Sequence, residues 1–124
     1  MKIKKVKIGI KGLKEVLEDF AETAEAIERG EKVKKRRGVY FENLEAFRRA
    51  LTEKRLEVLH VIKRECPSSV YELAKILKRD AKNVTQDLEY LKQIGLVEIK
   101  RTKEKKKRTI PEVKYDEIEL KIAV

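Results

Sequence analysis

The stretch from Ser69 to Arg108 constrains the fold more than any other part of the chain. Ser69 and Glu72 have the S-x-x-E spacing of a capping box, which predicts that a helix begins at Val70. Asp80 is a suitable N-cap for a second helix, and Gly95 suits the left-handed residue that follows its end. Apolar residues recur at helical intervals in both segments: Val70, Leu73, Ala74 and Leu77, then Val84, Leu88, Leu91 and Ile94. Two helices with so short a connection predict a helix-turn-helix.

A β-prone run and a basic run follow the second helix. Leu96, Val97 and Ile99 predict a strand, and residues 101–108 hold six basic side chains against one acidic side chain. A return through residues 109–110 would complete a β-wing, with Pro111 at a sheet edge or bulge.

A further helix precedes this segment. Thr52 is its predicted N-cap, and Pro67 is its stop signal. Its apolar face comprises Leu56, Leu59 and Ile62. Three helices followed by a wing give the element order of a winged helix-turn-helix.

The segment 52–110 resembles the MarR-type and related archaeal winged-helix regulators. The resemblance is carried by SSVYELAKILKRDAKNVTQDLEYLKQIGLVEIKR, above all by its EL-A-L pattern and its L-x-x-L-x-x-x-GLV end. A looser similarity through VYFENLEAFRRALTEKRLEVL extends to small regulators, some of them antitoxin-like. The resemblance implies a transcriptional regulator that binds double-stranded DNA as a homodimer on a palindromic site. MarR-like dimers join through helices of both termini, whereas the C-terminal segment here is predicted to be a strand.

The N-terminal segment predicts a small β-α-β unit. Val6, Ile8 and Ile10 alternate with polar or small residues as in a strand, and the second strand is either 32–35 or 39–41. Asn43 is expected to cap a short helix before Thr52. A last strand over 118–122 is expected to pair with the first.

The helix between these strands has an apolar seam at four- and three-residue intervals: Leu13, Leu17, Phe20, Ala24 and Ile27. We expect so short a seam to dock on its own domain; dimerisation is the alternative. The predicted fold is therefore α+β, with residues 1–51 as an N-terminal β-α-β extension and candidate dimerisation region. Residues 52–124 form the winged helix-turn-helix with its three helices, its wing and the C-terminal strand.

The formal net charge of +10 favours a polyanionic partner. The excess lies in residues 2–7, 32–37 and the predicted wing. Many charged residues and only two Asn and two Gln are typical of a thermophilic source.

The predicted DNA contacts lie on the second helix of the helix-turn-helix and on the wing. Asn83 and Gln86 could pair with adenine, Lys82 with guanine or a phosphate, and Thr85 with a thymine methyl group or a phosphate. The wing would follow the backbone or enter a minor groove through Arg101, Lys103, Lys105, Lys106, Lys107 and Arg108.

Other function classes find less support. Cys66 is the single cysteine and is expected to be a small buried side chain before Pro67, so neither an intramolecular disulfide nor a thiol-rich zinc site is predicted. No catalytic motif, metal-ligand cluster, cofactor motif, membrane span or signal peptide is recognisable, and His60 stands alone; we expect a cytoplasmic non-enzyme. A protein-interaction or antitoxin-like module and an RNA-binding protein remain alternatives, although the aromatic platform of an RNA reader is lacking.

Overall fold

The computed structural model describes residues 2–32, 38–102 and 109–124 of the chain. These residues form five helices and five short strands, which confirms the α+β class. The basic wing residues Lys103, Lys105, Lys106, Lys107 and Arg108 lie outside the described residues, as does most of the alternative strand at 32–35.

Three strands from the two ends of the chain form one parallel sheet. Strand β1 (Lys5–Ile10) lies between β2 (Val39–Phe41) and β5 (Glu117–Lys121). Ile8 is the register partner of Val39 on one side and of Leu120 on the other. Both the predicted β-α-β unit and the pairing of the last strand with the first are confirmed, so the N-terminal and C-terminal segments share a sheet.

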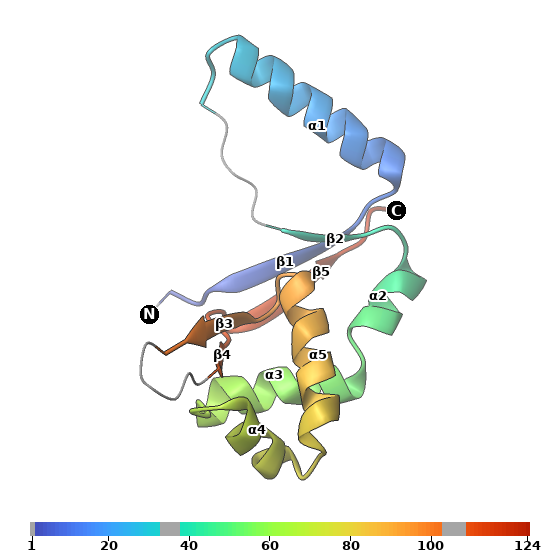
Figure 1. Ribbon diagram of the computed structural model, residues 1–124. Helices are drawn as coiled ribbons and strands as arrows, with labels where there is room; N and C mark the ends of the chain where they lie inside the picture. The colour runs from blue at the N-terminus through green and yellow to red at the C-terminus, as the bar shows by residue number, and fades with distance from the viewer. Residues whose placement is uncertain (1, 33–37, 103–108) are drawn as a thin grey trace.

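Helix α1 (Leu13–Glu28) lies on one side of this sheet and the other helices lie on the opposite side (Figure 1). These are α2 (Leu44–Ala50), α3 (Glu53–Glu65), α4 (Val70–Leu77) and α5 (Ala81–Gln93). Each of the four begins at the predicted N-cap, whose side chain accepts a backbone N–H hydrogen bond from the first turn: Asn43 at 2.7 Å, Thr52 at 3.2 Å, Ser69 at 3.1 Å and Asp80 at 3.3 Å. Gly95 has φ +86°, as the predicted helix end requires.

The core lies where α3, α4 and α5 meet the sheet. Ile8 of β1 is fully buried in it, together with most of the predicted stripes of α4 and α5; Val70, Leu77 and Ile94 of these stripes are partly buried against it. The fully buried side chains include Val58, Ile62, Leu73, Val84, Leu88, Leu91 and Leu96. Because a buried side chain of this size contributes about 1.5–3 kcal/mol, this cluster supplies most of the stabilisation. The stripe of α5 thereby fixes which side of that helix faces outward.

A two-stranded antiparallel sheet follows α5. Strand β3 (Glu98–Arg101) pairs with β4 (Thr109–Glu112), and Ile99 lies opposite the buried Pro111. Both strands are edges, so the predicted edge position of Pro111 is confirmed. The strand begins later than the predicted β-prone run, because Leu96 and Val97 are buried in the core ahead of it.

Two expectations are wrong. Cys66 is exposed rather than buried, because it is the left-handed C-cap of α3 at φ 46°, where the chain turns toward Pro67. The apolar seam of α1 does not dock on the other described segments, since no residue of α1 is buried. Among the described residues, no helix combines the length and the apolar character needed to cross a membrane.

Candidate nucleic-acid interface

The first two turns of α5 present polar side chains to solvent. Lys82, Asn83, Thr85 and Gln86 are all exposed. They face outward because Val84 and the rest of the apolar stripe hold the opposite side of the helix in the core. At about 100° per residue, Lys82 and Gln86 lie one above the other, with Asn83 and Thr85 on either flank. The structure therefore brings these four predicted contacts together on one surface.

The functional groups on this surface are available to a ligand. Within the described part of the chain, the amides of Asn83 and Gln86 have no hydrogen-bond partner and the Lys82 ammonium group has no ion pair. The Thr85 hydroxyl donates to the Ala81 carbonyl oxygen at 2.7 Å, and its oxygen still accepts. A donor-and-acceptor amide beside a cation is the combination that reads base edges next to phosphates.

An ion-pair network joins α5 to the neighbouring segments through Asp87. The Asp87 carboxylate accepts hydrogen bonds from Arg55 Nε at 3.2 Å and from Arg79 Nη2 at 2.8 Å. All three side chains are largely buried, with exposed fractions of 16–21%. The charge of Asp87, which follows Gln86 in the chain, is thus neutralised by two arginines, whereas Glu89 remains exposed one turn beyond Gln86.

Arg55 extends this network to the neighbouring helices. It donates to the carbonyl oxygens of Arg49 at 2.9 Å and Ala50 at 2.8 Å, at the end of α2, and lies 4.1 Å from the ring centroid of Tyr90. The arginine therefore joins α2, α3 and α5. Sequence reasoning missed this network; the available signal was Asp87, an acidic residue at helical spacing within the apolar stripe of α5.

The β3–β4 hairpin carries the remaining described candidate. Arg101 is exposed at the end of β3, and no interaction within the described residues joins it to α5. Elsewhere on the hairpin, Lys100 of β3 forms an ion pair with Glu112 of β4 at 3.1 Å, and Lys114, which follows β4, forms one with Glu98 at 3.0 Å. The hydrogen bond and charge of Glu98 raise the pKa of Lys114 above its ordinary value. The five other wing residues are not described, so their arrangement with Arg101 stays a prediction.

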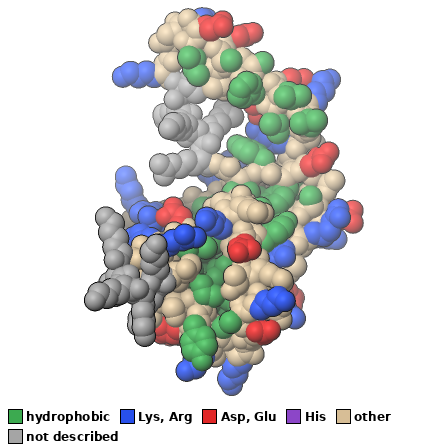
Figure 2. All heavy atoms as spheres, viewed as in Figure 1, with side chains coloured by type: hydrophobic (Ala, Val, Ile, Leu, Met, Phe, Trp, Pro, Cys, Tyr) green, Lys and Arg blue, Asp and Glu red, His purple; other side chains and the backbone are tan. Residues whose placement is uncertain are grey.

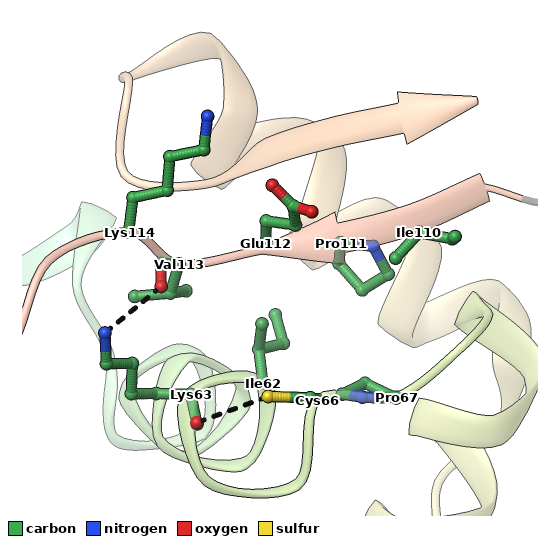
Figure 3. A pocket seen from close by; sticks show the side chains of 9 residues that line it. All are labelled: Ile62, Lys63, Cys66, Pro67, Ile110, Pro111, Glu112, Val113 and Lys114. Carbon is green, nitrogen blue, oxygen red and sulfur yellow. Dashed lines mark hydrogen bonds between the residues drawn. The ribbon is translucent and has the colours of Figure 1, made fainter. Parts of the chain in front are cut away.

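A small cavity lies elsewhere, between the end of α3 and β4 (Figure 3). Its volume is about 270 Å³, and its walls include Ile62, Pro67, Pro111 and Val113, with Cys66 beside them. Lys63 Nζ donates to the Val113 carbonyl oxygen at 3.5 Å across one side. Within the described ranges no group of three potential metal ligands occurs here or elsewhere. The cavity brings together none of the predicted site residues.

A comparison with family models identifies the chain's relatives. The model of HVO_A0114 matches residues 50–120, which is more than half of the chain. The chain belongs to the HVO_A0114 family. The HVO_A0114 match runs from the end of α2 through β5 and so includes the polar surface of α5, the Arg55–Asp87–Arg79 network and the hairpin. No curated protein and no solved structure matches the chain.

Proposed function

We propose that α3, α4, α5 and the β3–β4 hairpin form a winged helix-turn-helix, and that the protein is a transcriptional regulator that binds double-stranded DNA. Helix α5 enters the major groove with its first two turns, and the basic segment 101–108 follows the backbone or enters a minor groove. The target is a palindromic site bound by a homodimer.

The observation that carries this proposal is the outward side of α5. Its amides and ammonium group are exposed and uncommitted, and they stand on a helix whose opposite side is fixed in the core. Helix α4 precedes α5 with only Lys78, Arg79 and Asp80 between them, which is the short connection of a helix-turn-helix. A rigid helix with a free polar side presents a constant pattern of donors and acceptors, as sequence reading requires.

The charge distribution supports the same conclusion. The formal net charge is +10, and six of the basic residues lie between positions 101 and 108. Phosphate contacts by such residues supply affinity without sequence information, and their number determines the salt dependence. Replacing Lys105, Lys106 and Lys107 by Gln should lower the slope of log K against log salt by about 3.

Fluorescence anisotropy with two duplexes tests the proposal. One duplex comes from upstream of the protein's own gene, and the other is its scrambled sequence. Gln86→Ala should weaken binding to the native duplex by about tenfold to a hundredfold, since a bidentate base contact is worth ~1–3 kcal/mol. Gln93→Ala is the matched control, because this exposed glutamine is on the last turn of the same helix. Equal affinity for both duplexes, or equal effects of the two substitutions, would refute sequence reading through α5.

One observation favours the protein-interaction module as a second candidate. Phe20 on α1 is 74% exposed, whereas Phe41 and Phe47 pack edge-to-face with ring centroids 5.7 Å apart beside the core. An exposed phenylalanine on an unburied apolar seam is typical of a protein contact. Loss of a co-purifying protein in Phe20→Ser, with no DNA binding by the wild-type chain, would favour this module over the regulator.

A further inference from the structure

Helix α1 leaves a continuous apolar face uncovered. Its apolar residues recur at three- and four-residue intervals, so they share one side of the helix. Leu13, Leu17, Phe20 and Ile27 are 67%, 59%, 74% and 62% exposed. Figure 2 shows hydrophobic side chains along this helix. Contiguous apolar surface of this kind marks an interaction site.

The described part of the chain offers no matching surface for this face. The sheet separates α1 from the core (Figure 1), and the register places Lys5, Lys7, Glu117 and Glu119 together on the outward side of that sheet. Lys5 forms ion pairs with both glutamates, and Lys11 Nζ lies 4.7 Å from the ring centroid of Tyr40 on the same side, so this side is mostly charged. An ion pair joins α1 to the end of β1, from Lys11 Nζ to Asp19 Oδ2 at 2.6 Å, away from the apolar face of the helix. An apolar seam would gain nothing by folding down onto these charges.

We infer that the occupant of this face is α1 of a second copy of the chain, packed antiparallel about a twofold axis at the level of Glu22. In this arrangement the seam matches itself in size. Phe20 of each copy lies against Ala24 of the partner subunit, and Leu17 lies against Ile27 of the partner subunit. Each large phenylalanine thus opposes a small alanine near the centre, and the contacts between Leu17 and Ile27 lie on either side.

The charges beside the seam select the antiparallel direction. Lys14 is the only basic residue of α1, and it lies on the same flank of the seam as Glu28. In an antiparallel pair related by a twofold axis, each flank of the seam faces the same flank of the partner helix. Lys14 therefore lies opposite Glu28 of the partner subunit, twice per dimer. In a parallel pair this flank would face Val16 and Thr23 of the partner, without an ion pair. The remaining acidic residues, among them Glu18, Glu22 and Glu25, lie on the solvent side of the helix.

The available area agrees with a reversible dimer. Side chains of this size bury on the order of 150–250 Å² each when aromatic and less when aliphatic, so the face offers roughly 500 Å² per copy. Two copies together bury about 1,000 Å², near the lower end of specific interfaces. We therefore expect dissociation in the micromolar range. This pairing does not depend on DNA binding.

Sedimentation velocity of the full chain, from roughly 1 μM to 1 mM, tests the pairing. The wild-type chain should shift from monomer to dimer, and Phe20→Glu should stay monomeric. Because Phe20 is outside the core, the variant should unfold at the wild-type temperature. A monomeric wild-type chain throughout this range, or a dimer that Phe20→Glu leaves intact, would overturn the proposal and assign the face to another partner.

A charge exchange tests the direction of the helices. Lys14→Glu alone and Glu28→Lys alone should each raise the dissociation constant by about tenfold, through two lost ion pairs and two new repulsions. The double variant should restore the wild-type constant. Glu22→Lys is the matched control, since it changes the same charge on the solvent side and should have little effect. A double variant that binds no better than the single ones would overturn the antiparallel pairing.

Discussion

Replacing Asp87 by asparagine should destabilise the fold more than any surface substitution on α5. The carboxylate has Arg55 Nε at 3.2 Å and Arg79 Nη2 at 2.8 Å, and its side chain is 16% exposed. An amide of the same shape keeps the packing but removes the charge that both guanidinium groups face. Within the described residues Arg79 Nη1 is already buried without a hydrogen-bond partner. No other described acceptor therefore compensates this arginine when the Asp87 charge is removed.

The expected loss follows from these contacts. A hydrogen bond to a charged group contributes about 1.5–3 kcal/mol, and breaking a buried ion pair from one side costs about 3–5 kcal/mol. Since the groups are about one-fifth exposed, water compensates in part, and we expect a loss of about 2–4 kcal/mol. For a chain of this length that lowers the melting temperature by roughly 10 °C.

Urea unfolding followed by far-UV circular dichroism measures this loss. The midpoint should fall with an unchanged denaturant slope. Glu89→Gln, an exposed acidic position on the same helix, is the control and should change stability by less than about 0.5 kcal/mol. A loss below about 1 kcal/mol for Asp87→Asn would refute the view that this network holds α5.

Four further substitutions test other parts of the fold. Tyr115→Phe removes a partly buried 2.7 Å hydrogen bond to the Leu96 carbonyl oxygen and should lower the free energy of unfolding in urea by about 1 kcal/mol. Burial raises the pKa of Tyr115, so the wild-type chain, unlike the variant, should also lose stability above about pH 10 in alkaline melts. The hydrogen bond from the Lys4 backbone lowers the pKa of Asp116; its contribution is present above about pH 4 and is lost as the pH falls further, a dependence that acid titration of Asp116→Asn should lack. Lys78 has φ 55°, so Lys78→Gly should raise the melting temperature through a gain of about 0.5–1 kcal/mol, whereas Lys75→Gly inside α4 should lower it.

Local signals predicted the helices well. The caps at Asn43, Thr52, Ser69 and Asp80 all accept the expected backbone hydrogen bonds, because capping depends on residues only two or three positions apart. Gly95, which follows the end of α5, has the predicted left-handed conformation for the same reason. The buried stripes of α4 and α5 followed from helical spacing.

Features that depend on distant residues were harder to predict. The seam of α1 has the spacing of a docking helix, yet the spacing does not say what lies opposite, and the nearby sheet face proved charged. Cys66 was expected to be a small buried side chain at the end of a helix before Pro67, but the left-handed turn at the end of α3 directs it to solvent. The partners of Asp87 come from two other segments of the chain, so no local pattern could name both.

Chemical-shift mapping of the isotope-labelled chain with the upstream duplex tests the central proposal most directly. Amide and side-chain shifts should concentrate on Lys82, Asn83, Thr85 and Gln86 and at the end of β3, while the outward face of α1 and the cavity beside Cys66 stay unchanged. Shifts confined to those other surfaces, or no shifts at a duplex concentration that saturates the anisotropy signal, would contradict recognition of DNA through α5.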